Sequence, residues 1–116
     1  MGDIFRYLIR VFLEFLIRLF RIWRARRWPS ADGTIVRAVA TVVDDGWAPV
    51  VFYSFAVNSC EYCGDLQGAP GIDAPKRASE IRPGDHIVVR FKPGNPSRNV
   101  ALNDDNRERL PFTIAE

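Results

Sequence analysis

The first 28 residues carry the feature that most constrains this chain, an apolar helical pattern marked by a charge at every third or fourth position. The charged positions are Asp3, Arg6, Arg10, Glu14, Arg18, Arg21 and Arg24. On a helix of 3.6 residues per turn they occupy an arc of roughly 120°, which leaves about two thirds of the circumference apolar. A helix in water cannot leave so wide an apolar face uncovered, so a bilayer surface, a partner helix or the rest of the chain must cover it.

A single membrane-spanning helix fits this segment poorly. Its length is adequate, since roughly 20 residues cross the hydrocarbon core. However, Arg10, Glu14 and Arg18 lie near its centre, and each costs about 2.5 to 3.5 kcal/mol on the insertion scale, which offsets the gain from the apolar residues. Spanning becomes acceptable where the charged stripes of several helices face one another. Lying in the membrane plane avoids this cost, because Arg side chains reach the headgroups while the apolar face sits below them.

In the in-plane arrangement, two groups of residues meet the membrane. The apolar group is expected to contact the acyl region, and it consists of Phe5, Leu8, Phe12, Leu16, Leu19, Trp23 and Trp28. The basic group is expected to contact lipid headgroups, and it consists of Arg18, Arg21, Arg24, Arg26 and Arg27. Residues 1–28 hold seven Arg against two acidic residues, and tryptophans flank the last of them. Interfacial aromatics beside clustered Arg are typical of an anionic membrane surface.

Two other arrangements would also cover the apolar face. The helix could pack on its own domain, or pair with a copy of itself in a soluble homo-oligomer. The pattern argues against a secretory signal, because Arg interrupts the apolar region and no small-residue cleavage site follows. An Arg-rich transit peptide is a closer match, but Glu14 and the absence of Ser from the helix oppose it.

Composition and charge limit the rest of the molecule. A chain of 116 residues with 47% hydrophobic content suits one modest domain plus an appendage. The net charge of +2 is unevenly distributed, because residues 29–116 hold nine Lys or Arg and twelve Asp or Glu. A slightly acidic domain lacks the basic face that duplex binding requires, so nucleic acid is not the expected partner.

The hydropathy period changes from 3.6 to 2 after a turn-rich segment that contains Pro29 and Gly33. We therefore divide the chain into a basic amphipathic helix (1–28), a linker (29–33), a small β-domain (34–102) and a C-terminal tail (103–116). Strands are expected at 34–43, 50–57, 60–66, 86–92 and 99–102, with turns at 44–49, 58–59, 82–85 and 93–96 and a loop with one helical turn at 67–80. The expected inward positions are Val36, Ala38, Ala40, Val42, Val51, Tyr53, Phe55, Val57, Ile87, Val89 and Phe91. This order predicts an α+β fold, an N-terminal helix followed by a small antiparallel β-barrel or curled sheet of about five strands.

Two segments resemble a known family. They are Val-Phe-Tyr-Ser-Phe-Ala-Val-Asn at 51–58 with Tyr-Cys-Gly at 62–64, and Arg-Pro-Gly-Asp-His-Ile-Val-Val-Arg-Phe-Lys-Pro-Gly-Asn-Pro-Ser-Arg at 82–98. The chain resembles, over roughly residues 33–102, a mostly bacterial family of small β-domains of unknown function that accompany transmembrane or membrane-adjacent helices. The resemblance implies an all-β domain and a membrane context, but no activity. We expect the protein at the inner face of a bacterial cytoplasmic membrane.

Residues that could carry chemistry are few. Cys60 and Cys63 invite a redox or metal interpretation, but in a strand they point to opposite faces, with Cα atoms about 10 Å apart. Zinc needs about four ligands, and only His86 could join the two cysteines. Alternation places it with Arg90 and Lys92 on the polar face. Tyr53, Phe55 and Phe91 could stack bases if exposed, although alternation predicts that they lie in the core.

These observations predict a non-enzymatic protein without a cofactor, a catalytic residue or a metal site. Its helix would bind an anionic membrane, and its β-domain would bind or scaffold a partner. A soluble homo-oligomer assembled through the helix faces is the alternative, and single-stranded nucleic-acid binding by the small barrel is a weaker one.

Overall fold

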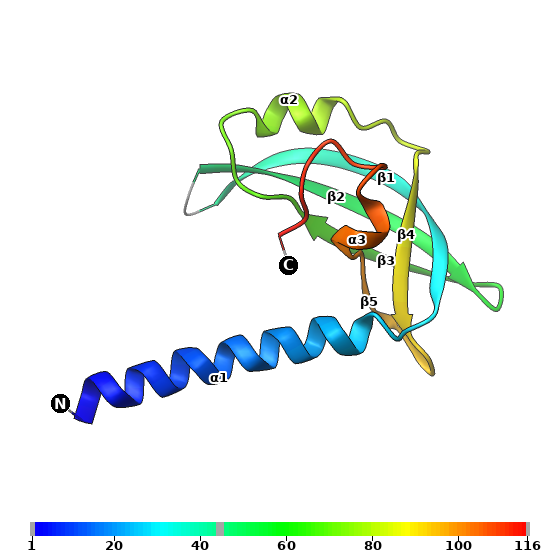
Figure 1. Ribbon diagram of the computed structural model, residues 1–116. Coiled ribbons are helices and arrows are strands. Elements are labelled where there is room, and N and C mark those ends of the chain that lie inside the picture. Colours follow the sequence, from blue (N-terminus) through cyan, green and yellow to red (C-terminus); the bar gives the residue numbers. More distant parts are fainter. Residues whose placement is uncertain (1, 44–45, 116) are drawn as a thin grey trace.

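The computed structural model describes residues 2–43 and 46–115, and it has the expected α+β architecture (Figure 1). The elements in chain order are α1 (Gly2–Ala25), β1 (Ser30–Val43), β2 (Gly46–Val57), β3 (Cys60–Gln67), α2 (Ala74–Ser79), β4 (His86–Lys92), β5 (Asn95–Val100) and α3 (Asn103–Asn106). All strands pair antiparallel in one sheet, in the order β3-β2-β1-β4-β5. The sheet curls into a nearly closed barrel. From here on, the β-domain means this barrel and the segment that follows it, up to residue 115.

Local sequence sets the hairpins of this sheet. The β2–β3 hairpin has the expected two-residue turn, since Asn58 and Ser59 adopt φ values of 52° and 68° and Val57 pairs with Cys60. Positive φ at both positions is the type I′ geometry, and Asn tolerates it better than most residues. The turn between β4 and β5 places Gly94 at φ 82°, a value that glycine adopts without strain. Because that turn is short, β5 begins at Asn95, four residues earlier than expected.

The inward face of the long strand β1 differs from the predicted one. Val36 and Val42 are 56% and 68% exposed, whereas Ile35 is buried. A register shift between Ile35 and Arg37 marks a β-bulge opposite β2. One extra residue reverses the alternation, so that Val36 points outward while Ile35 and Ala38, three positions apart, both reach the core. Val42 is on the same face as Ala38, so its exposure reflects its place next to the end of β1.

The element boundaries also differ from expectation at three places. Residues 30–33, expected as a linker, form the start of β1 and pair with β4. Residues 44 and 45 of the expected turn lie outside the described residues, and residues 46–49 belong to β2. Residues 110–114, expected in a tail, complete the core with Leu110, Phe112 and Ile114.

Five of the seven expected core residues of β2 and β4 are buried, and Val57 and Phe91 are partly buried against them. Val51, Tyr53 and Phe55 are buried along β2, and Ile87 and Val89 are fully buried along β4. The C-terminal segment lies against the end of β3, because Ala69 donates to the Thr113 carbonyl and Ala115 to the Gln67 carbonyl, both at 2.8 Å. Main-chain pairing of this kind fixes the segment as part of the barrel wall.

A polar seam joins β3 and β5 where the sheet curls back on itself. The Asn99 side-chain amide donates to the Cys63 carbonyl at 3.2 Å, and the Tyr53 hydroxyl donates to Asn99 Oδ1 at 2.6 Å. Gly64 lies under this contact, and a Cβ there would collide with the Asn99 side chain and the Tyr53 hydroxyl. The close approach of β5 to β3 therefore requires glycine at this position.

We expect the buried Tyr53 hydroxyl to make the β-domain less stable at alkaline pH. Burial raises the pKa of Tyr53 well above its usual value, and the negative charge of Asp65 adds to the shift. The stabilisation is complete below the unfolded-state pKa near 10, and above it the free energy of unfolding should fall by about 1.4 kcal/mol per pH unit. Denaturant unfolding from about pH 8 to pH 11 measures this slope.

The control for this prediction is a comparison of two tyrosine variants. Tyr53→Phe should have a shallower alkaline slope than the unsubstituted protein, whereas Tyr7→Phe, at an exposed position, should not. Equal slopes for Tyr53→Phe and the unsubstituted protein would contradict the assignment.

Candidate membrane-binding helix

Helix α1 extends from the β-domain as a separate rod with the N-terminus at its far end (Figure 1). Six of the seven residues expected to contact the membrane lie on it, with exposed fractions between 43% and 66%, namely Phe5, Leu8, Phe12, Leu16, Leu19 and Trp23. Only Ala25, at its last position, is buried. The described part of the chain therefore leaves the apolar face of α1 uncovered.

The centre of the apolar face points away from the β-domain. A groove of about 1000 Å³ separates the C-terminal half of α1 from β3, β5 and the C-terminal segment, and we call it the α1 groove. On the helix side it is lined by Leu16, Ile17, Phe20, Arg21, Ile22, Arg24 and Ala25. Of the six expected membrane contacts on α1, only Leu16 is among them. At about 100° per residue, this lining lies mainly along the charged stripe and its margin, so the centre of the apolar face around Phe12 is free.

Trp28, the seventh expected membrane contact, lies apart from the other six. It is half-buried at the junction between α1 and the β-domain, and it lines the α1 groove. Its main-chain carbonyl accepts a hydrogen bond from Arg90. Its position is therefore fixed by the β-domain rather than by the apolar stripe.

The five expected headgroup contacts divide into two groups. Arg18, Arg21 and Arg24 are exposed on the charged stripe of α1. Arg26 and Arg27 lie beyond the helix and have partners. Arg26 forms an ion pair with Asp104 at 2.9 Å, and the Arg27 guanidinium lies 3.9 Å from the centre of the Trp23 ring system. An Arg stacked on an exposed Trp keeps both groups together at the base of the helix.

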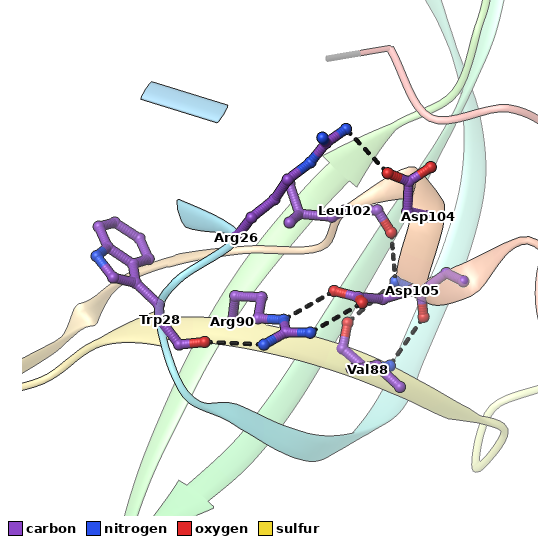
Figure 2. Close-up of polar contacts among 8 residues, drawn as sticks. Arg26, Trp28, Val88, Arg90, Leu102, Asp104 and Asp105 are labelled. Atoms are coloured by element: carbon purple, nitrogen blue, oxygen red, sulfur yellow. Dashed lines mark hydrogen bonds and ion pairs between the residues drawn. The ribbon is translucent and has the colours of Figure 1, made fainter. Parts of the chain in front are cut away.

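The ion pair between Arg90 and Asp105 holds the base of α1 against the β-domain. The Arg90 guanidinium lies between the Asp105 carboxylate and the Trp28 carbonyl (Figure 2). It donates to the two carboxylate oxygens at 2.9 Å and 3.1 Å, and to the carbonyl at 2.9 Å. The hydrogen bond to Asp105 raises the pKa of Arg90. The Phe91 amide also donates to the Pro29 carbonyl at 3.1 Å. A bidentate pair with a third acceptor restricts the direction in which the chain leaves α1.

Asn106 is the residue of this junction that sequence reasoning missed. It is 1% exposed, and its side chain accepts from the Val88 amide at 2.8 Å and donates to the Val88 and Leu102 carbonyls at 3.0 Å and 2.9 Å. It thereby pairs with β4 beyond the end of β5. The sequence alone places this residue in the C-terminal tail, because no local pattern distinguishes this asparagine from an exposed one.

The remaining candidate residues lie outside this junction. Cys60 and Cys63 are exposed free thiols on β3, and His86 is exposed at the start of β4. Tyr53 and Phe55 lie in the core, as alternation predicts, so they offer no stacking surface for a base. Within residues 2–43 and 46–115, no three His, Cys, Asp or Glu side chains come together as a metal-binding group.

Among the described residues, no helix is both long and apolar enough to span a membrane. Comparison of the chain with protein-family models, with curated proteins and with solved structures gives no match.

Proposed function

We propose that this chain is a non-enzymatic membrane-surface protein whose helix α1 lies in the plane of an anionic bilayer and carries the β-domain beside it. The observation that supports this most strongly is the apolar face of α1, which is exposed along the described helix and turned away from the β-domain. An amphipathic helix with Arg on its polar face and Phe, Leu and Trp on the other is the usual form of an in-plane anchor. The proposed location is the inner face of a bacterial cytoplasmic membrane, where anionic lipids would attract the Arg stripe.

The orientation of the helix supports this proposal. Because the β-domain lies toward the charged side of α1, the apolar face can enter the acyl boundary without contact between the β-domain and the lipid. Arg18, Arg21 and Arg24 would then lie at headgroup level, where anionic lipids attract them with about 1 kcal/mol each. The junction at Arg90 would hold the β-domain at a defined angle above the surface, where it could bind or scaffold a partner.

Vesicle flotation tests the proposal with a matched pair of double variants in the full chain. Phe12→Asp with Leu19→Asp places two charges at the centre of the apolar face, and should weaken binding to phosphatidylglycerol-containing vesicles more than about 1,000-fold. Tyr7→Asp with Ile17→Asp adds the same charge to the same helix, but both positions lie within the charged stripe. This control should lose about 30-fold, since two added charges lower the electrostatic attraction by about 1 kcal/mol each.

Two outcomes would contradict the proposal. Equal losses in the two double variants would mean that net charge alone drives binding. Absence of flotation of the unsubstituted chain, together with a concentration-dependent oligomer that Phe12→Asp with Leu19→Asp dissolves, would favour the homo-oligomer alternative. Neutral phosphatidylcholine vesicles should bind the chain more weakly than anionic ones, because the Arg contribution is lost.

A further inference from the structure

The α1 groove has an apolar floor formed by the barrel and an apolar wall formed by the helix. Leu66, Leu102 and Ile114 line the floor, and each is buried in the β-domain with one side toward the groove. Leu16 and Phe20 line the wall, and they are 43% and 56% exposed. Both surfaces are therefore apolar, and the space between them is not filled by any described part of the chain.

The edge of the groove is basic. Arg21 and Arg24 lie on the helix side, and Lys92 and Arg98 lie on the strand side. Asp65 is the acidic residue among those that line it. Four cations against one carboxylate around an apolar cleft favour a ligand with an anionic end and an apolar body, because the low dielectric of such a cleft strengthens the attraction.

We propose that the α1 groove binds one molecule of an anionic amphiphile, with its acyl chain between α1 and the β3–β5 seam and its headgroup at the basic edge. The volume of about 1000 Å³ is at the upper end of the range of about 300 to 1,000 Å³ that small-molecule sites occupy. This inference goes beyond surface binding, because the groove holds a single lipid molecule in solution. It uses a different side of α1 from the face around Phe12.

Isothermal titration with monomeric lysolipids tests this site in the full chain. The probes are 12-carbon lysophosphatidylglycerol and lysophosphatidylcholine below their micelle concentrations, so that chain length is constant and only the headgroup charge differs. The anionic probe should bind with a stoichiometry of one, at least tenfold more tightly than the zwitterionic probe. Amide chemical-shift changes should concentrate at residues 65–67 and 97–102, which line the groove.

Matched variants locate the ligand. Ala115→Trp fills the groove from an exposed position and should abolish binding, whereas Ala56→Trp, exposed on β2 away from the groove, should leave it unchanged. Arg21→Gln should weaken the anionic probe about fivefold, and Arg18→Gln, which does not line the groove, should not. Equal affinities for the two probes, or binding that survives Ala115→Trp with shift changes confined to α1, would overturn the proposal.

The double variant of the apolar face separates this inference from the proposed function. Phe12→Asp with Leu19→Asp should retain stoichiometric lysolipid binding, because neither residue lines the groove. Ala115→Trp should conversely still float with anionic vesicles. Loss of lysolipid binding in the apolar-face variant would show that the probe binds along the open face of α1, and would overturn the groove assignment alone.

Discussion

Replacing Asn106 by Ala is expected to lower the free energy of unfolding by about 2 to 5 kcal/mol, because two main-chain groups of β4 lose their partner at once. These groups are the Val88 amide and the Val88 carbonyl. The Leu102 carbonyl also loses the side-chain bond, but as the N-cap of α3 it keeps its intrahelical one. Each buried group left without a hydrogen bond costs about 1 to 3 kcal/mol. Urea unfolding at neutral pH measures the change, and hydrogen exchange at the Val88 amide should accelerate in the variant.

Two further variants control this result. Asn106→Asp keeps an acceptor for the Val88 amide but loses both donors and buries a charge, so it should cost at least as much as Ala. Asn95→Ala removes an exposed asparagine from β5 and should change stability by less than about 0.5 kcal/mol. A loss of under about 1 kcal/mol for Asn106→Ala would mean that water replaces the side-chain amide, and would remove its assigned role.

Phe112→Ala is expected to lower the free energy of unfolding by about 3 to 4 kcal/mol, as large-to-small changes in a packed core do. Phe112 is 7% exposed and belongs to the core cluster. Its ring lies directly over Gly68, where a Cβ would collide with it. The C-terminal segment thus contributes to the folded core, and removing its aromatic side chain leaves a cavity that the paired main chain cannot close.

The neighbouring residue provides the control for this prediction. Thr113→Ala changes an exposed side chain in the same segment and should alter stability by less than about 0.5 kcal/mol. Similar small effects for Phe112→Ala and Thr113→Ala would show that residues 110–114 are an accessory tail, as the sequence alone had suggested. The two measurements use the same denaturant series, so the difference between them is independent of extrapolation.

Several features of this protein follow from local sequence alone. The helix, its charged stripe and its end before Pro29 come from residues within a few positions of one another. Alternation also identified the inward residues Val51, Tyr53 and Phe55, and Asn58-Ser59 identified the hairpin turn. Each of these signals is a period or a backbone preference, which a short segment carries by itself.

The tertiary structure decided the remaining features, because they depend on residues far apart in the chain. The bulge after Ile35 reverses the alternation of β1, and its position depends on pairing with β2. β5 pairs with β4 only from Arg90 onward, so the main chain of Val88 has no partner in β5. The Asn106 side chain bonds to it instead and is therefore buried. Which side of α1 faces the β-domain, and therefore which side stays free, is set at the junction by the contacts of Arg90 with Trp28 and Asp105. No period in the sequence records such contacts, since they join groups 15 and 62 residues apart.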